Sequence, residues 1–132
     1  MKQKNISFNY MYSDASNYKR HGQVVFANQR SIPVGEIEKK IRAALSDGKY
    51  FIARQVDITE CFFGTPDKQD DHPWHEFCNV RETKQPAFDP KHEPNRDIAE
   101  FIESVEKASR DGWDETKVRE DIAEVLQKQT TN

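Results

Sequence analysis

The chain has 132 residues, the length of one domain, and can bury a core without disulfides or metal ions. Charged residues make up 33% of it and the formal net charge is −3, which disfavours a surface that binds nucleic acid by charge alone. No apolar run approaches a membrane span, no signal-peptide core follows Met1, and two cysteines are too few for a secreted disulfide framework, so we expect a cytoplasmic protein with reduced thiols and no membrane partner.

The first third of the chain is predicted to form two strands and a long loop. Residues 6–12 alternate apolar and polar side chains, and residues 23–27 form a second β-type run. The segment between them, 13–22, is too long for a tight hairpin turn and is dense in turn-forming side chains. Loops held between paired strands often carry function, so this loop is the first candidate region.

A helix is predicted next, because apolar residues recur at helical spacing over residues 34–45. Ser31 is expected to cap it and Pro33 suits its first turn. The pair at residues 47–48, Asp-Gly, is expected to end it with a positive φ angle.

The middle of the chain returns to β-type patterns. Residues 49–58 and 74–81 are predicted strands, and the short apolar run 61–63 is predicted as a strand or its edge. Residues 82–94 contain three prolines and are predicted as an extended connector, because the residue before a proline is disfavoured in a helix.

Two helices are predicted at the end, one capped by Asn95 and one starting at Asp114 or Thr116, with the break at Asp111-Gly112. The fold class is therefore α+β, with a mostly antiparallel sheet of four to five strands, one helix after the first hairpin and two C-terminal helices. Helices on one face of this sheet would leave the other face for binding. The predicted single domain is divided into sheet plus first helix (6–82), connector (83–94), helical pair (95–127) and tail (128–132).

The stretch from residue 70 to residue 80 combines two histidines, a tryptophan, a cysteine and three carboxylates. If Trp74 and Val80 face the core, the period of two places Glu76 beside them, where a carboxylate is costly. If Phe77 faces the core instead, Trp74 and Val80 break the pattern. One side of this strand is irregular in either case, and such conflicts mark candidate sites, although a bulge or a solvated edge strand would explain it equally.

His72 and His75 have a spacing that would suit a metal on a helix, but in a strand such positions face opposite sides. The alternative to a site is that His72 is a solvated loop residue and His75 a hydrogen-bonded surface residue. Neither a CxxC nor an HExxH spacing is present, so no metal, cofactor or catalytic residue is assigned. Cys61 lies in an aromatic run where a thiol is expected to be inert, and Cys78 would face away from His75.

The motifs at residues 10–19 (YMYSDASNYK) and 71–77 (DHPWHEF) resemble those of a group of small uncharacterised bacterial and phage proteins. The resemblance covers roughly residues 6–107 and implies that the loop and the second motif belong to one unit. It implies no activity and transfers no functional residue. A mobile-element origin would make inhibition of a host defence component one concrete version of the function.

The leading hypothesis is a small non-catalytic binding or regulatory protein whose partner is a protein or a small anionic ligand. Aromatic rings would stack on the ligand, basic side chains would meet anionic groups, and polar side chains would fix its orientation. The predicted ligand-binding residues are Tyr12, Asp14, Asn17, Tyr18, Lys19, Arg20, His21, Trp74, His75 and Glu76. The alternatives are a hydrolase that uses His72, His75 and Glu76, with or without a metal, and an oligomerisation or scaffold module that uses the C-terminal helices.

Overall fold

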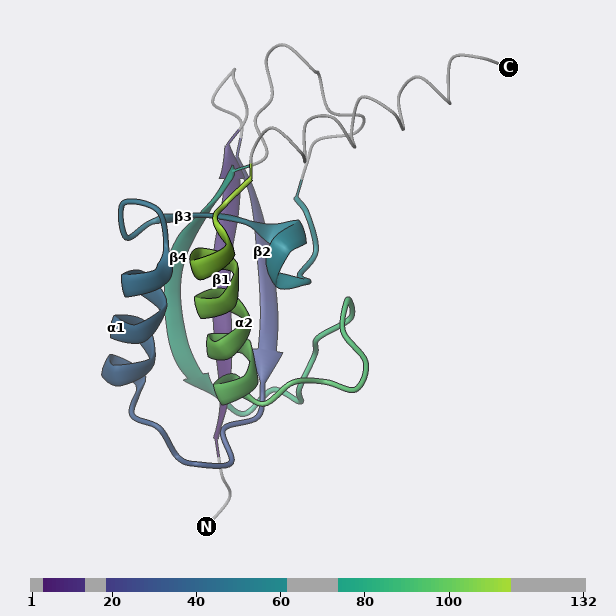
Figure 1. Ribbon diagram of the computed structural model, residues 1–132. Helices are drawn as coiled ribbons and strands as arrows, with labels where there is room; N and C mark the ends of the chain where they lie inside the picture. Colours follow the sequence, from purple (N-terminus) through teal and green to yellow (C-terminus); the bar gives the residue numbers. More distant parts are fainter. Residues whose placement is uncertain (1–3, 14–18, 62–73, 115–132) are drawn as a thin grey trace.

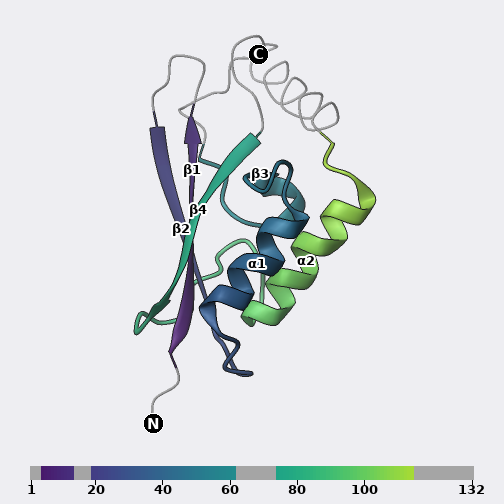
Figure 2. The same cartoon turned by 90° about the vertical axis from the view of Figure 1, so that its left-hand side faces the viewer.

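The computed structural model describes residues 4–13, 19–61 and 74–114 as an α+β fold. One antiparallel sheet has the strand order β2-β1-β4-β3, and both described helices lie on the same face of it (Figures 1 and 2). The strands are β1 (Asn5–Ser13), β2 (Lys19–Phe26), β3 (Tyr50–Ile52) and β4 (Trp74–Thr83), and the helices are α1 (Val34–Ala44) and α2 (Ile98–Asp111). None of the described helices is long and apolar enough to cross a bilayer.

Strand β1 confirms the predicted alternation and supplies the centre of the core. Its inward side chains, Ile6, Phe8, Tyr10 and Tyr12, are all buried. The ring of Phe8 lies edge-on to Phe101 of α2, with the ring centroids 4.9 Å apart. Large aromatic side chains therefore fill the space between sheet and helices, as the aromatic-rich composition suggests.

Strand β2 begins earlier than the sequence indicates. Lys19, Arg20 and His21 were expected in a loop, but they pair with β1 in register, Ser13 opposite Lys19 and Met11 opposite His21. All three side chains are exposed, so no apolar residue marks this half of the strand. Residues 14–18 lie outside the described part.

Helix α1 buries Ile37, Ile41 and Ala44 as its spacing predicts. Its N-cap is Pro33, and the predicted cap Ser31 instead adopts a positive φ of 50° in the preceding turn. The helix ends at Ala44, a few residues before the positive-φ pair Asp47 and Gly48.

The predicted strand at 49–58 is wrong beyond Ile52. Strand β3 has only three residues, and the chain then turns through a 3₁₀ helix, η1 (Ala53–Val56), which ends at Asp57 with a φ of 55°. Ala53 and Val56 are both buried, because the tight helical turn brings residues three apart onto one side. Their apolar character therefore suits the turn as well as it suits a strand.

Helix α2 starts after Asp97 and not after the predicted cap Asn95. The Asp97 carboxylate accepts a hydrogen bond from the Ala99 amide (3.0 Å), and the Glu100 side chain accepts one from the Asp97 amide (3.2 Å). This reciprocal pair is a capping box. The predicted last helix and the tail lie outside the described residues, as does most of the apolar run 61–63.

A β-bulge in β4 accounts for the irregular pattern in the sequence. Tyr10 pairs with Phe77, but Asn9 pairs with Asn79, so Cys78 is an extra residue on β4. Phe77 and Val80 are consequently both buried in the core, whereas each of the two alternatives predicted from the sequence placed only one of them there.

Candidate functional site

The predicted ligand-binding residues do not form one cluster. Asp14, Asn17 and Tyr18 lie outside the described residues, as does His72. The described ones divide between the two faces of the sheet. Tyr12 and His75 belong to the inner, helix-covered face, and His21 and Glu76 belong to the outer face.

His75 is a core residue, which corrects both its predicted role as a ligand and the alternative of a surface histidine. Its side chain is 1% exposed. The Cys61 amide donates a hydrogen bond to Nε2 of His75 (2.9 Å). That nitrogen must therefore carry a lone pair, so the neutral ring is protonated on Nδ1. Its lone pair is already used and cannot serve a metal or a substrate proton.

Tyr12 is also buried, at 1% exposure, and its ring centroid lies 5.1 Å from that of His75. It cannot offer the stacking surface that was predicted for it. Its neighbour on the same face, Tyr10, donates a hydrogen bond from its hydroxyl to the Thr59 carbonyl (2.6 Å). Burial is the main cause that raises the pKa of Tyr10 far above its ordinary value. These rings are structural, and their alternation with Ile6 and Phe8 was the signal for it.

Trp74 is half-buried at the start of β4. Its ring lies edge-on to that of Trp113, at a centroid distance of 6.5 Å, and Nε1 of Trp113 donates to the Ala44 carbonyl (3.2 Å). Trp113 packs against the core from the end of α2, as a tryptophan at a helix junction usually does. The two rings therefore join the sheet to both helices.

The outer face carries a row of side chains that crosses the sheet. Met11 pairs with His21 on one side and with Glu76 on the other, and Glu76 pairs with Tyr50. Residues that pair directly across strands point to the same face. We call this outer face, with Asn9, Met11, His21, Gln23, Glu76 and Asn79, the open sheet face.

Lys19 and Cys78 belong to the same face. Burial raises the pKa of the Cys78 thiol, the charge of Glu76 raises it further, and the charge of Lys19 lowers it. The thiol is therefore not activated as a nucleophile. Cys61 is buried on the inner face, where burial also raises its pKa, so the prediction of an inert thiol agrees with its setting.

Hydrogen bonds between side chains order the centre of the open sheet face. The Asn9 amide group donates to the Asn79 side-chain oxygen (2.9 Å) and to the Ser7 hydroxyl (3.1 Å). Asn9 also pairs directly with Gln23 on β2. Amide side chains on three adjacent strands thus form a second polar row beside the first.

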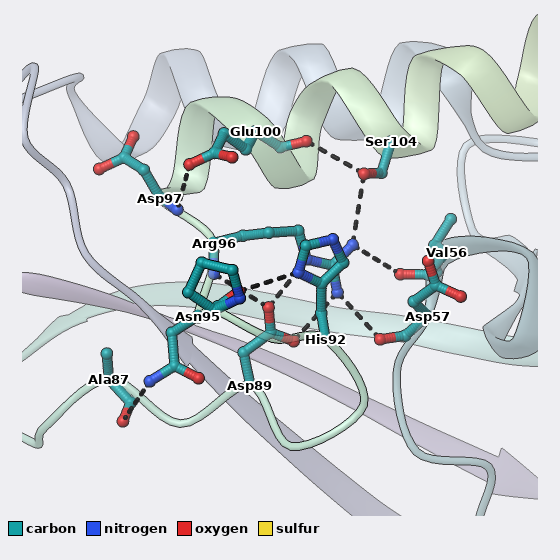
Figure 3. A network of polar contacts seen from close by, with 11 residues as sticks. Val56, Asp57, Ala87, Asp89, His92, Asn95, Arg96, Asp97, Glu100 and Ser104 are labelled. Carbon is teal, nitrogen blue, oxygen red and sulfur yellow. Dashed lines mark hydrogen bonds and ion pairs between the residues drawn. The ribbon is translucent and has the colours of Figure 1, made fainter.

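A buried ion pair that the sequence reasoning missed holds the connector against the core (Figure 3). Nε and one terminal nitrogen of Arg96 donate to the two carboxylate oxygens of Asp89 (2.8 and 3.0 Å). The remaining donors reach the carbonyls of Val56 and Asp57 (both 2.9 Å) and the Ser104 hydroxyl (3.3 Å). All five guanidinium N–H groups are thereby satisfied. No local sequence pattern signals this pair, because both residues stand among prolines and other charged residues.

No protein-family model matches the chain, and comparisons with curated proteins and with solved structures also give no match. The chemistry of the site must therefore be judged from its own geometry.

That geometry separates the described residues of the hydrolase hypothesis. His75 and Glu76, which the hydrolase hypothesis would combine, point to opposite faces of the sheet. Within the described ranges no three His, Cys, Asp or Glu residues are grouped as a metal site would need. The open sheet face instead offers donors, acceptors, a thioether and charges of both signs over three strands.

Proposed function

We propose that this chain is a small, cytoplasmic, non-catalytic protein that binds a protein partner through the open sheet face. The row His21, Met11 and Glu76 on the face opposite both helices carries the proposal. An imidazole ring, a polarisable thioether and a carboxylate side by side can meet polar and apolar groups of a partner at once.

The shape of this surface supports a macromolecular partner over the small anionic ligand. Small-molecule sites are concave and enclose most of their ligand, whereas a pleated sheet face is broad and shallow. The charges on the face are also of both signs, since those of Lys19 and Glu76 act in opposite directions on the pKa of the Cys78 thiol. Charges of mixed sign give specificity for a patterned protein surface. Sequestration or inhibition of that partner is the regulatory outcome we propose.

Photocrosslinking in cells tests the proposal. A photoreactive phenylalanine analogue is placed at Gln23 or at Asn79 on the open sheet face, or at the exposed Glu103 of α2 as a matched control. We expect the same protein to be crosslinked from both sheet positions and not from α2. The purified partner should then bind the natural chain and lose affinity when Met11 is replaced by Asp.

The proposal fails if the α2 position gives the same crosslinks as the sheet positions. It also fails if the crosslinked protein, once purified, binds the Met11→Asp chain as tightly as the natural chain. Circular dichroism of each variant confirms that the fold is retained before the crosslinks are compared.

A further inference from the structure

One half of the β2 edge has no backbone partner among the residues that the structure describes. Val25 exchanges both of its backbone hydrogen bonds with Phe88 (2.9 and 2.8 Å), so its N–H and C=O point away from β1. Lys19, His21 and Gln23 lie at every second position before Val25, so their backbone N–H and C=O groups also point away from β1. Among the described residues, no backbone group pairs with these outward N–H and C=O groups.

The connector pairs with the other half of the β2 edge, at Val25, and does not continue along the edge. The antiparallel bridge between Val25 and Phe88 is a single pair. If this pairing continued, Pro90 would lie opposite Gln23, and a proline has no N–H to donate. The Asp89 side chain is meanwhile held by Arg96 in the buried pair, which draws the chain inward. The burial of β2 shows the same division. The side chains of Lys19, Arg20, His21 and Gln23 are exposed, and those from Val24 to Phe26 are buried.

Strand β3, which borders the start of β4 at the opposite side of the sheet, is short and already partly paired. Strand β3 has three residues, and Tyr50 already exchanges backbone hydrogen bonds with Ser46 (both 2.9 Å). Among the described residues, β3 therefore leaves fewer outward backbone groups to pair than Lys19, His21 and Gln23 provide on β2.

We propose that an extended acidic segment of the partner pairs antiparallel with residues 19–23 and adds a strand to the sheet at β2. This deepens the proposed function, on which it rests, by naming the kind of segment that is bound. Main-chain hydrogen bonds to an exposed edge supply affinity, and side chains at alternate positions supply specificity. The pairing of Phe88 with Val25 shows that this edge accepts an antiparallel strand in the direction proposed.

The charge of the edge selects the acidic partner. Lys19 and Arg20 are both positive and β2 contains no carboxylate, although the whole chain has a net charge of −3. Opposite charges paired across strands stabilise a sheet, and like charges destabilise it. An acidic strand would meet Lys19 on the open sheet face, whereas β2 of a second copy would bring the same basic residues together.

A synthetic peptide of alternating glutamate and valine, about six residues long like a typical strand, serves as the probe. A peptide of alternating lysine and valine is its control. The variant His21→Pro removes an outward N–H without removing a β1–β2 hydrogen bond, so the melting temperature should be retained. His21→Ala keeps the N–H and isolates the side chain.

We expect the acidic peptide to bind and to shift amide resonances of residues 19–23, and the lysine peptide to leave them unchanged. His21→Pro should weaken binding by about tenfold, the effect of one lost hydrogen bond and a ring at the interface, while His21→Ala changes it by less than about threefold. Equal affinity in the proline variant, or no binding of the acidic peptide, would overturn the inference. A concentration-dependent dimer that His21→Pro abolishes would overturn it too, since a second copy would then occupy the edge.

The two proposals fail separately. Crosslinks from Gln23 and Asn79 without any peptide binding would leave the proposed function standing and reject the added strand. Peptide pairing at β2 without a shared partner in cells would do the reverse.

Discussion

The buried pair of Arg96 and Asp89 gives the sharpest test of how this fold is held together. Arg96 is 2% exposed and the Asp89 side chain is 0% exposed. Removing one partner of a buried ion pair leaves an uncompensated charge and costs about 3–5 kcal/mol. Arg96→Met additionally leaves the Val56 and Asp57 carbonyls without their donor, at about 1–3 kcal/mol each at most.

Strong energetic coupling is expected between these two residues. Domains are stable by only about 5–15 kcal/mol, so Arg96→Met is expected to bring the chain close to unfolding, and Asp89→Asn is the milder single change. The double variant Arg96→Met/Asp89→Asn should cost about as much as the worse single variant, and not the sum of both. Urea unfolding followed by circular dichroism and tryptophan fluorescence measures all four corners of the cycle.

An exposed ion pair supplies the control for this cycle. Nζ of Lys40 lies 3.6 Å from Oε1 of Glu36 on α1, and the two side chains are 49% and 51% exposed. Lys40→Met should change the unfolding free energy by less than about 0.5 kcal/mol. Losses below about 1 kcal/mol for both single variants of the buried pair, or a double variant that equals their sum, would refute the coupling expected between Arg96 and Asp89.

Three further predictions concern the sheet. A Cβ on Gly22 would lie 2.5 Å from Tyr10, so Gly22→Ala should destabilise the fold by about 1–3 kcal/mol in urea, whereas Gly35→Ala, with open space around it, should not. His75→Phe leaves the Cys61 amide without its acceptor and should cost about 1–3 kcal/mol; equal stability would show that this bond is dispensable. Because its pKa is raised, the Cys78 thiol should react with iodoacetamide more slowly at pH 8 than an exposed cysteine and accelerate as the pH rises, and a rate already constant at pH 8 would contradict the shift.

The elements that alternate or repeat regularly could be predicted from sequence. Strand β1 has four inward apolar side chains in succession, and α1 has a clear apolar stripe. The first half of β2 could not be predicted, because an exposed edge strand buries nothing on either face and leaves no alternation. The bulge at Cys78 could not be predicted either, because one extra residue shifts the alternation without any distinctive residue type at the bulge.

The candidate site was predicted only in part, for related reasons. His21 and Glu76 do share a face, but Tyr12 and His75 were placed in the binding surface because polar atoms on a side chain suggest exposure. Tyr12 lies two residues from Tyr10, and His75 lies two residues from Phe77. In a strand this spacing places each pair on the same face, which here is the core face. Arg96 and Asp89 are brought together by the connector and are recognisable only in three dimensions.

The strand order has a consequence for how the chain folds. The central pair of the sheet is β1 with β4, and the side chains of Asn9 and Asn79 that meet there are 70 residues apart in the chain. The β1–β2 hairpin and α1 can be made early during synthesis, but the other side of β1 has all of its partners only once residue 83 has been added. Such distant pairing slows folding, and the aromatic face of β1 also lacks its cover from Phe101 until α2 has been synthesised.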